Sequence, residues 1–329
     1  MRLLFIFTGG TIGSTSGEQF IEIDNNKPQK LIYEYENHYG IDFDYDIIIP
    51  YSELSENNTG SNIKSLVTAV KSNINKYDGI IVAHGTDTLQ YTSAALGYCI
   101  GNYSIPVCII SSNYPLEDER ANGSYNLRGA IRFILEKRGR GVWTVYKNNN
   151  SFTTFHRAAR LLHGIAFSDS VYSVKNQFYG FYDNSFTFHK NKNFFEQKDE
   201  TFLLDVNNLS DTANNIIRIN PYVGMEYSVL NNDIKYIIHE SYHSGTINTK
   251  SKYVIDFFHN AKKLGIECFI TGVTDDKSYE STKYFNDLCL KPIYNISPVA
   301  AYMKLWLADS CGYNVDKVLN KSLSGDIVL

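Results

Sequence analysis

Residues 79–88 read GIIVAHGTDT. The apolar run 79–83 has the length and composition of a strand that is buried on both faces, and a polar turn follows it directly. Residues 89–100 then carry a helix-like pattern. Because ligands of an open parallel sheet bind at the carboxyl ends of its strands, we expect the threonines and the carboxylate of this turn to lie at a binding site.

The start of the chain repeats this arrangement. Residues 3–7 predict a strand, and the turn TGGT at 8–11 follows it. Either turn alone is only a polar turn of a common kind. Two threonine-bearing turns, each after a strand and 75 residues apart from Thr11 to Thr86, are a more specific signal. We expect them to face one pocket.

Strand-like and helix-like segments alternate through the first half of the chain. The pattern predicts strands at 46–49, 79–83, 106–110 and 141–146, and helices at 63–74 (with Ser61 or Asn62 as N-cap), 88–100 and 127–135. Such alternation indicates right-handed crossovers and a parallel sheet covered on both faces, which is an α/β fold. Residues 150–190 lack a helical period and predict short antiparallel strands.

The length of 329 residues is too great for one typical core and favours two domains. We predict a large N-terminal domain over 1–190 and a polar, irregular linker over 191–215. A smaller α/β domain over 216–329 follows, with strands at 234–239 and 266–271 and helices at 254–264, 279–289 and 297–309.

Composition excludes several classes of function. A net charge of -4 argues against nucleic-acid binding, and the basic cluster at 137–140 suits a helix end. No apolar stretch is long enough to span a membrane, and the first residues lack the features of a signal peptide. The five cysteines are scattered without a Cys-x-x-Cys pair, which indicates reduced thiols and a cytoplasmic protein.

Several stretches together resemble the bacterial-type L-asparaginase family, which includes asparaginase-glutaminases and the asparaginase-like subunit of a transfer-RNA amidotransferase. The resemblance covers nearly the whole chain. It rests on FTGGTIG at 7–13, LSENNTG at 54–60, DGIIVAHGTDT at 78–88, YPLEDERANG at 114–123 with NL at 126–127, and the segment 296–305. The stretch at 114–123 is similar to the cytoplasmic branch of the family.

The resemblance implies a parallel-sheet N-terminal domain, a smaller α/β C-terminal domain and a specific reaction. That reaction is hydrolysis of L-asparagine, or a related small amide, to L-aspartate and ammonia through an acyl-enzyme, with no metal or cofactor. Thr11 would be the nucleophile, while Thr86 and Asp87 would form the second half of the catalytic site. Asp87 and Glu56 would hold the substrate α-ammonium group, and Ser55 the α-carboxylate.

The resemblance also implies a homodimer or homotetramer in which the small domain of a neighbouring subunit completes each site. Ser244 and Glu280 occupy the positions from which that contribution would come. The expected partner is therefore a small amino-acid amide together with further copies of the chain, and neither a nucleic acid nor a membrane.

This sequence departs from the family at the lysine that handles protons. The corresponding stretch, residues 153–160, reads TTFHRAAR, and our best register places Ala158 at the lysine position. Arg157 or Arg160 could restore the charge, but a guanidinium stays protonated and cannot act as a base. A catalytically weakened relative that binds an amino-acid-like ligand or a partner is therefore the alternative function.

A second departure lies in the lid of the site. The family tyrosine there corresponds to Phe20, which keeps the ring and loses the hydroxyl group. Tyr33 or Tyr35 could compensate for that loss.

Two histidine features offer competing interpretations. Residues 239–243 read HESYH, the zinc-peptidase pattern, which requires a helix so that both imidazoles share one face. The preceding run 234–238 instead predicts a strand, so we interpret the pattern as a strand end. His84 could serve as a general base, but its place at a strand end favours a core or orienting role.

Overall fold

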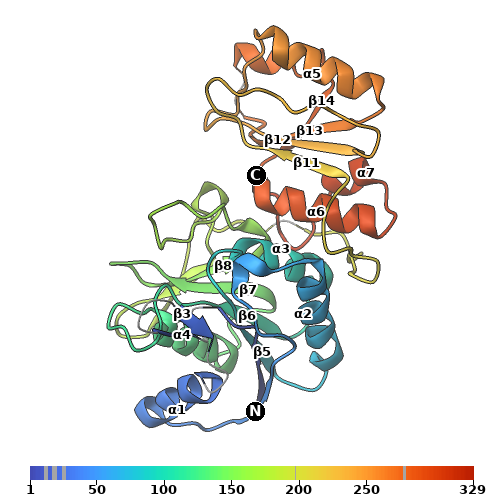
Figure 1. Ribbon diagram of the computed structural model, residues 1–329. Coiled ribbons are helices and arrows are strands. Elements are labelled where there is room, and N and C mark those ends of the chain that lie inside the picture. The colour runs from blue at the N-terminus through green and yellow to red at the C-terminus, as the bar shows by residue number, and fades with distance from the viewer. Residues whose placement is uncertain (11–13, 17–20, 24–26, 197, 277–278) are drawn as a thin grey trace.

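The structure is a computed structural model that describes residues 1–10, 14–16, 21–23, 27–196, 198–276 and 279–329. It contains a large sheet of eight strands and a smaller sheet of four, which lie at opposite ends of the molecule (Figure 1). The mixed α/β fold predicted from the sequence is confirmed. None of the helices in the described segments is long and apolar enough to cross a membrane.

The large sheet is parallel in its centre and antiparallel at one side. Its order is β10-β9-β8-β7-β6-β5-β1-β4. The parallel strands are β4 (Asp44–Ile48), β1 (Arg2–Phe7), β5 (Gly79–Ala83), β6 (Pro106–Ile110) and β7 (Gly141–Lys147). The antiparallel strands are β8 (Thr153–Arg157), β9 (Gly180–Tyr182) and β10 (Phe188–Lys190), as the pattern of residues 150–190 predicted.

Helices cover both faces of this sheet because side chains alternate along its strands. In β1, Leu4 and Ile6 pack in a core with α2 (Gly60–Asn73) and α3 (Leu89–Ile100). Leu3 and Phe5 pack on the other face with α1 (Lys27–Tyr39) and α4 (Gly123–Leu135). Two-sided burial explains why the strands read as unbroken apolar runs. After β1, the short strands β2 (Ser14–Ser16) and β3 (Ile21–Ile23) pair antiparallel in a sheet of their own.

The small sheet is entirely parallel, in the order β11-β12-β13-β14. Its strands are β11 (Ile216–Ile219), β12 (Tyr236–Glu240), β13 (Glu267–Val273) and β14 (Leu290–Tyr294). Helix α5 (Lys252–Lys263) covers its outer face, and α6 (Pro298–Ser310) lies between this sheet and α3 (Figure 1). Helix α7 (Val315–Leu319) packs on α6.

The two sheets fall on either side of the linker predicted at 191–215, but α6 shares a continuous apolar core with α3. The domain limits themselves stay a prediction. The helix predicted over 279–289 is wrong, because a short 3-10 helix, Glu280–Tyr284, stands there. The N-cap of α2 is Thr59 and not Ser61 or Asn62, since the backbone N–H of Thr59 donates to Asn62 Oδ1 at 2.9 Å.

Candidate active site

The turns that follow β1 and β5 meet at the carboxyl edge of the large sheet. The backbone N–H of Thr8 donates to the carbonyl of Ala83 at 3.1 Å, which holds the end of one strand to the end of the other. A Cβ atom built on Gly10 would lie only 2.5 Å from the backbone nitrogen of Gly85. Gly10 and Gly85, which directly precede Thr11 and Thr86, are therefore in backbone contact.

The segment around Ser55 lies against both of these turns. The N–H of Glu53 donates to Thr8 and its carbonyl accepts from Gly10, both at 3.0 Å, so this segment runs along the first turn. A Cβ on Gly85 would lie 2.5 Å from Ser55 Oγ. Glycine is therefore required at position 85 so that the buried Ser55 can approach the second turn.

His84 is an orienting residue at the base of the second turn. Its Nδ1 donates to the carbonyl of Gly85 at 2.8 Å, so Nε2 carries no hydrogen and accepts from Asn58 Nδ2 at 3.1 Å and Thr92 Oγ1 at 3.0 Å. Complete burial lowers the pKa of His84 to about 4. The ring is thus neutral and fully engaged, which confirms the core role over the general-base role.

Two carboxylates stand beside the second turn. Burial and the neighbouring Glu56 carboxyl raise the pKa of Asp87. Within the described part of the chain, neither carboxylate has a lysine or arginine partner. Two unneutralised carboxylates at one place favour a cation, and a substrate ammonium group would relieve their repulsion.

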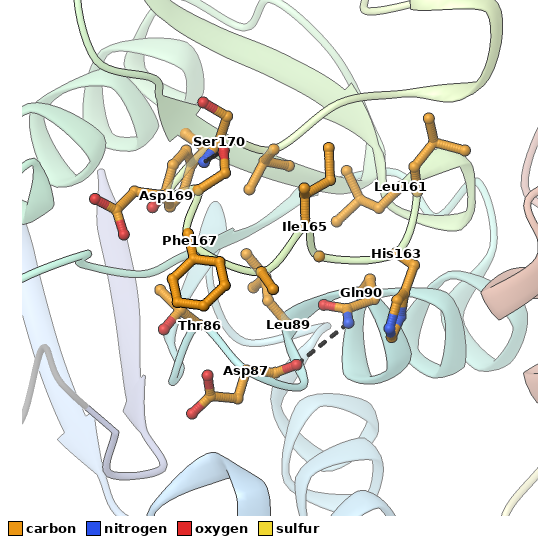
Figure 2. A pocket seen from close by; sticks show the side chains of 16 residues that line it. Thr86, Asp87, Leu89, Gln90, Leu161, His163, Ile165, Phe167, Asp169 and Ser170 are labelled. Atoms are coloured by element: carbon orange, nitrogen blue, oxygen red, sulfur yellow. Dashed lines mark hydrogen bonds between the residues drawn. The ribbon is translucent and has the colours of Figure 1, made fainter.

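A cavity of about 450 Å³ opens at Thr86 and Asp87. Its other walls come from the start of α3, from Tyr146 on β7 and from the loop 161–171 (Figure 2). In Figure 2, Gln90 lies between Asp87 and His163, and its side-chain amide donates to the Asp87 carbonyl at 3.2 Å. The volume is in the range of small-molecule sites.

No described lysine or arginine lines this cavity. Ala158, the residue in the register of the family lysine, is fully buried in the apolar core. Arg157 is buried with its guanidinium over the Trp143 ring and pairs with Glu196. Arg160 donates to the carbonyls of Gly325 and Phe195. Neither arginine therefore restores the missing charge beside Thr86.

The remaining predicted site residues are not brought to this cavity within one chain. Ser244 lines a separate cavity of about 450 Å³ in the small domain, and Glu280 is exposed on a 3-10 helix. Tyr33 is exposed and Tyr35 is buried in the core beside α4, so neither replaces the lid hydroxyl at the cavity. Thr11 and Phe20 lie outside the described residues.

The HESYH segment has the strand geometry predicted for it. His239 lies in β12, where its Nδ1 donates to the Glu240 carbonyl and Nε2 accepts from Tyr227 at 2.8 Å. His243 lies beyond the strand, so the two imidazoles do not share a helical face. The donor arrangement of a zinc-peptidase helix is not formed here.

Sequence reasoning missed two features beside the cavity. One is the loop 161–171 with its exposed Phe167, which the apolar residues within a polar, irregular stretch could have indicated. The other is a link between the two sheets. There, Arg218 of β11 pairs with Glu240 at 2.6 Å and donates to the hydroxyl of Tyr91 on α3, whose ring meets His163 edge-on.

Comparisons with known proteins agree with this fold. Residues 2–168 match the family description "Asparaginase, N-terminal", so the chain belongs to the asparaginase family. Over 128 residues it is 32% identical to L-asparaginase 1 of Escherichia coli K12, which is 38% of either protein. It is 45% identical over 65 residues to the L-asparaginase of Thermococcus kodakarensis, covering 20% of either protein.

The matched regions therefore span well under half of the length of these curated relatives. The similarity in fold covers more of the chain than the similarity in sequence does. The structure of L-asparaginase I from Vibrio cholerae superposes with a TM-score of 0.78 over 100% of this chain and 99% of that one, at 19% identity. At this identity the superposition establishes a shared fold.

Proposed function

We propose that this protein hydrolyses the side-chain amide of L-asparagine, or of a related small amide, to a carboxylate and ammonia. One observation carries the proposal: the backbone contact of Gly10 with Gly85, which joins the turns that precede Thr11 and Thr86. A hydroxyl group and a carboxylate, those of Thr86 and Asp87, line one cavity, and a nucleophilic hydroxyl with such neighbours is what the reaction needs.

In the proposed reaction the Thr11 hydroxyl oxygen attacks the amide carbon, and the hydroxyl proton leaves with the amide nitrogen as ammonia. Water then hydrolyses the ester. Glu56 and Asp87 hold the ammonium group of the substrate, and Ser55 binds its carboxylate. This assignment is supported by the close approach of Ser55 to Gly85 and by the raised pKa of Asp87 beside Glu56.

Replacement of threonine by valine tests the role of the second turn without changing side-chain volume. We expect Thr86→Val to lower the rate of ammonia and aspartate release from L-asparagine by roughly 10²–10⁴-fold, the usual value of proton-transfer assistance. Thr11→Ala should abolish turnover. Thr201→Val, at an exposed position away from the cavity, is the matched control. A folded wild-type protein that releases no ammonia from asparagine or glutamine would contradict the proposal.

The second candidate function is a binding protein derived from such an enzyme. The absence of any described lysine or arginine at the cavity favours it, since the proton-handling group of the family has no replacement there. Calorimetric binding of L-aspartate or L-asparagine without turnover would support this function over hydrolysis.

We also propose that a neighbouring subunit supplies Ser244 and Glu280 to the site, since neither residue lines the cavity of its own chain. The protein would then be a homodimer or homotetramer in solution. Sedimentation of a monomer that retains full activity would overturn this assignment.

A cytoplasmic location is part of the same proposal and is supported by five cysteines that are all free.

A further inference from the structure

Strand β6 ends beside the start of the second turn. Ile110, the last residue of β6, pairs with Ala83, the last residue of β5, so the residues that follow them also lie side by side. The N–H of His84 donates to the carbonyl of Ile110 at 2.9 Å. The hydroxyl of Ser111 donates to the carbonyl of His84 at 2.6 Å. The end of β6 therefore holds His84 at both its N–H and its carbonyl group.

Ser111 is itself fixed by further contacts in the core. Its own carbonyl accepts from Asn126 Nδ2 on α4 at 2.8 Å, and Asn126 Oδ1 accepts from the N–H of Lys147 at the end of β7 at 2.7 Å. Ser111, His84 and Asn126 are all completely buried within one chain. A neighbouring subunit placed at the cavity therefore leaves these contacts unchanged.

The carbonyl groups of His84 and Gly85 are both engaged in the core. Ser111 donates to the first, and His84 Nδ1 donates to the second at 2.8 Å. In a planar trans peptide unit the N–H points opposite to the carbonyl group. The N–H of Gly85 therefore points away from Ser111, and the N–H of Thr86 points away from the buried imidazole. Within the described part of the chain, neither of these N–H groups donates to another group.

Thr86 is the residue through which this arrangement affects the proposed reaction, because it lines the cavity. When an amide is hydrolysed, negative charge develops on its carbonyl oxygen. A backbone N–H that is held in place beforehand stabilises this charge without reorganisation, and it does so more in the transition state than in the ground state. A turn with its carbonyl groups fixed in the core is suited to present such an N–H.

We propose that Ser111 is a positioning residue of the proposed hydrolysis. By holding the His84 carbonyl, it keeps the turn at 84–86 in the orientation that presents the N–H and the hydroxyl of Thr86 to the substrate amide. The inference rests on the proposed function. Ser111 does not touch the substrate and acts through His84 and Gly85. The competing explanation is that Ser111 only stabilises the end of β6, and the two roles give different kinetics.

The first test measures kcat and KM for L-asparagine together with the midpoint of urea unfolding. We expect Ser111→Ala to lower kcat roughly 10–100-fold, as when a transition-state donor is displaced, and to change KM little. Ser111→Cys fills the same space but offers a weaker donor, so its kcat should lie between the two. This variant keeps the inference testable if Ser111→Ala does not fold.

Ser93→Ala is the matched control. Ser93 is also completely buried, but its Oγ accepts from Thr144 Oγ1 on β7 at 3.0 Å, and it does not line the cavity. Its replacement should lower the urea midpoint to a similar extent and leave kcat unchanged. If Ser111→Ala and Ser93→Ala lose similar stability and both keep the wild-type kcat, Ser111 has a structural role alone and the inference is overturned.

A spectroscopic measurement separates this inference from the proposed hydrolysis. In protein with isotopically labelled threonine, the amide resonance of Thr86, assigned by its loss in Thr86→Val, should shift in Ser111→Ala and not in Ser93→Ala. If asparagine is hydrolysed and Ser111→Ala keeps the wild-type kcat, the inference fails and the proposed function stands. If nothing is hydrolysed but the resonance shifts, the proposed function fails and the positioning of Thr86 by Ser111 stands. An unshifted resonance rejects that positioning in either case.

Discussion

Glycine 85 shows how a single missing side chain shapes the candidate active site. Its Cα lies against Ser55, and a Cβ there would meet both Ser55 Oγ and Ser55 Cβ, at 2.5 and 2.6 Å. Ser55 is buried and cannot swing into solvent. Its carbonyl also accepts from Thr88 Oγ1 at 2.9 Å, which fixes its backbone. The chemistry assigned to Ser55 therefore depends on the absence of a side chain at position 85.

We predict that Gly85→Ala destabilises the protein by about 1–3 kcal/mol, the usual cost of overpacking, and raises KM for asparagine. Urea unfolding and steady-state kinetics measure the two effects. Adding Ser55→Gly removes the overlapping atoms, so the double variant should regain stability and still bind the substrate carboxylate poorly. If Gly85→Ala leaves both stability and KM unchanged, the close approach of the two segments is wrong.

The position of the second turn at the sheet edge could be predicted from the sequence, but the walls of the cavity beside it could not, for a physical reason. A buried parallel strand followed by a polar turn leaves a local pattern, so the positions of Thr86 and Asp87 at a sheet edge could be predicted. The loop 161–171 has no regular period, and its place over the cavity depends on long-range packing. Where the Arg157 and Arg160 side chains point depends on partners far away in the sequence. One of these is Gly325, whose carbonyl accepts from Arg160, and a local sequence pattern contains no information on it.

At the scale of elements, long segments with strong periodicity were predicted well and short ones poorly. The strand Gly79–Ala83 and the helix Leu89–Ile100 lie almost where the pattern predicts them. Helix α1 was not predicted although Leu31, Ile32 and Tyr35 give it an apolar face. Residues 279–289 bury only Phe285 and Leu288 in the core of the small domain, which a single turn accomplishes without an α-helix.

A buried ion pair and a hydrogen bond connect helix α6 with α3. Lys304 Nζ lies 2.8 Å from Asp326 Oδ2, and both side chains are fully buried. The hydroxyl of Tyr98 on α3 donates to the same oxygen at 2.9 Å. The cluster therefore joins α3, α6 and the C-terminal segment at one point.

We predict that Lys304→Met destabilises the protein by about 3–5 kcal/mol, because it leaves Asp326 as an unpaired buried charge. Urea denaturation measures the loss. The double variant Lys304→Met/Asp326→Asn removes both charges and should recover much of it. Exposed Lys317→Met serves as the control. Equal stability of the single and double variants would show that the unpaired charge of Asp326 is not the cause of the destabilisation.

At the scale of the whole molecule, both halves contain buried histidines whose pKa is lowered. Burial lowers the pKa of three histidines to about 4, namely His84, His156 and His239. His84 directly follows β5 and His156 lies in β8, both in the large sheet's domain, and His239 lies in β12 of the small sheet. Each of the three rings is held neutral in the folded protein, and each can be protonated freely once the chain unfolds.

We predict that the free energy of unfolding falls by several kcal/mol between pH 7 and pH 5. The folded pKa of these histidines lies below the unfolded value of about 6.5, so in this window the unfolded chain binds more protons and stability decreases as pH falls. The loss of unfolding free energy that one histidine can cause is limited to about 3 kcal/mol, and this limit is reached only near pH 4. Urea unfolding at a series of pH values measures the slope. His259→Gln, which changes an exposed histidine on α5, should leave that slope intact, whereas His156→Phe should reduce it. A stability that is constant from pH 7 to pH 5 would mean that these imidazoles are protonated equally in the folded and unfolded states, and that their burial in both sheets is incomplete.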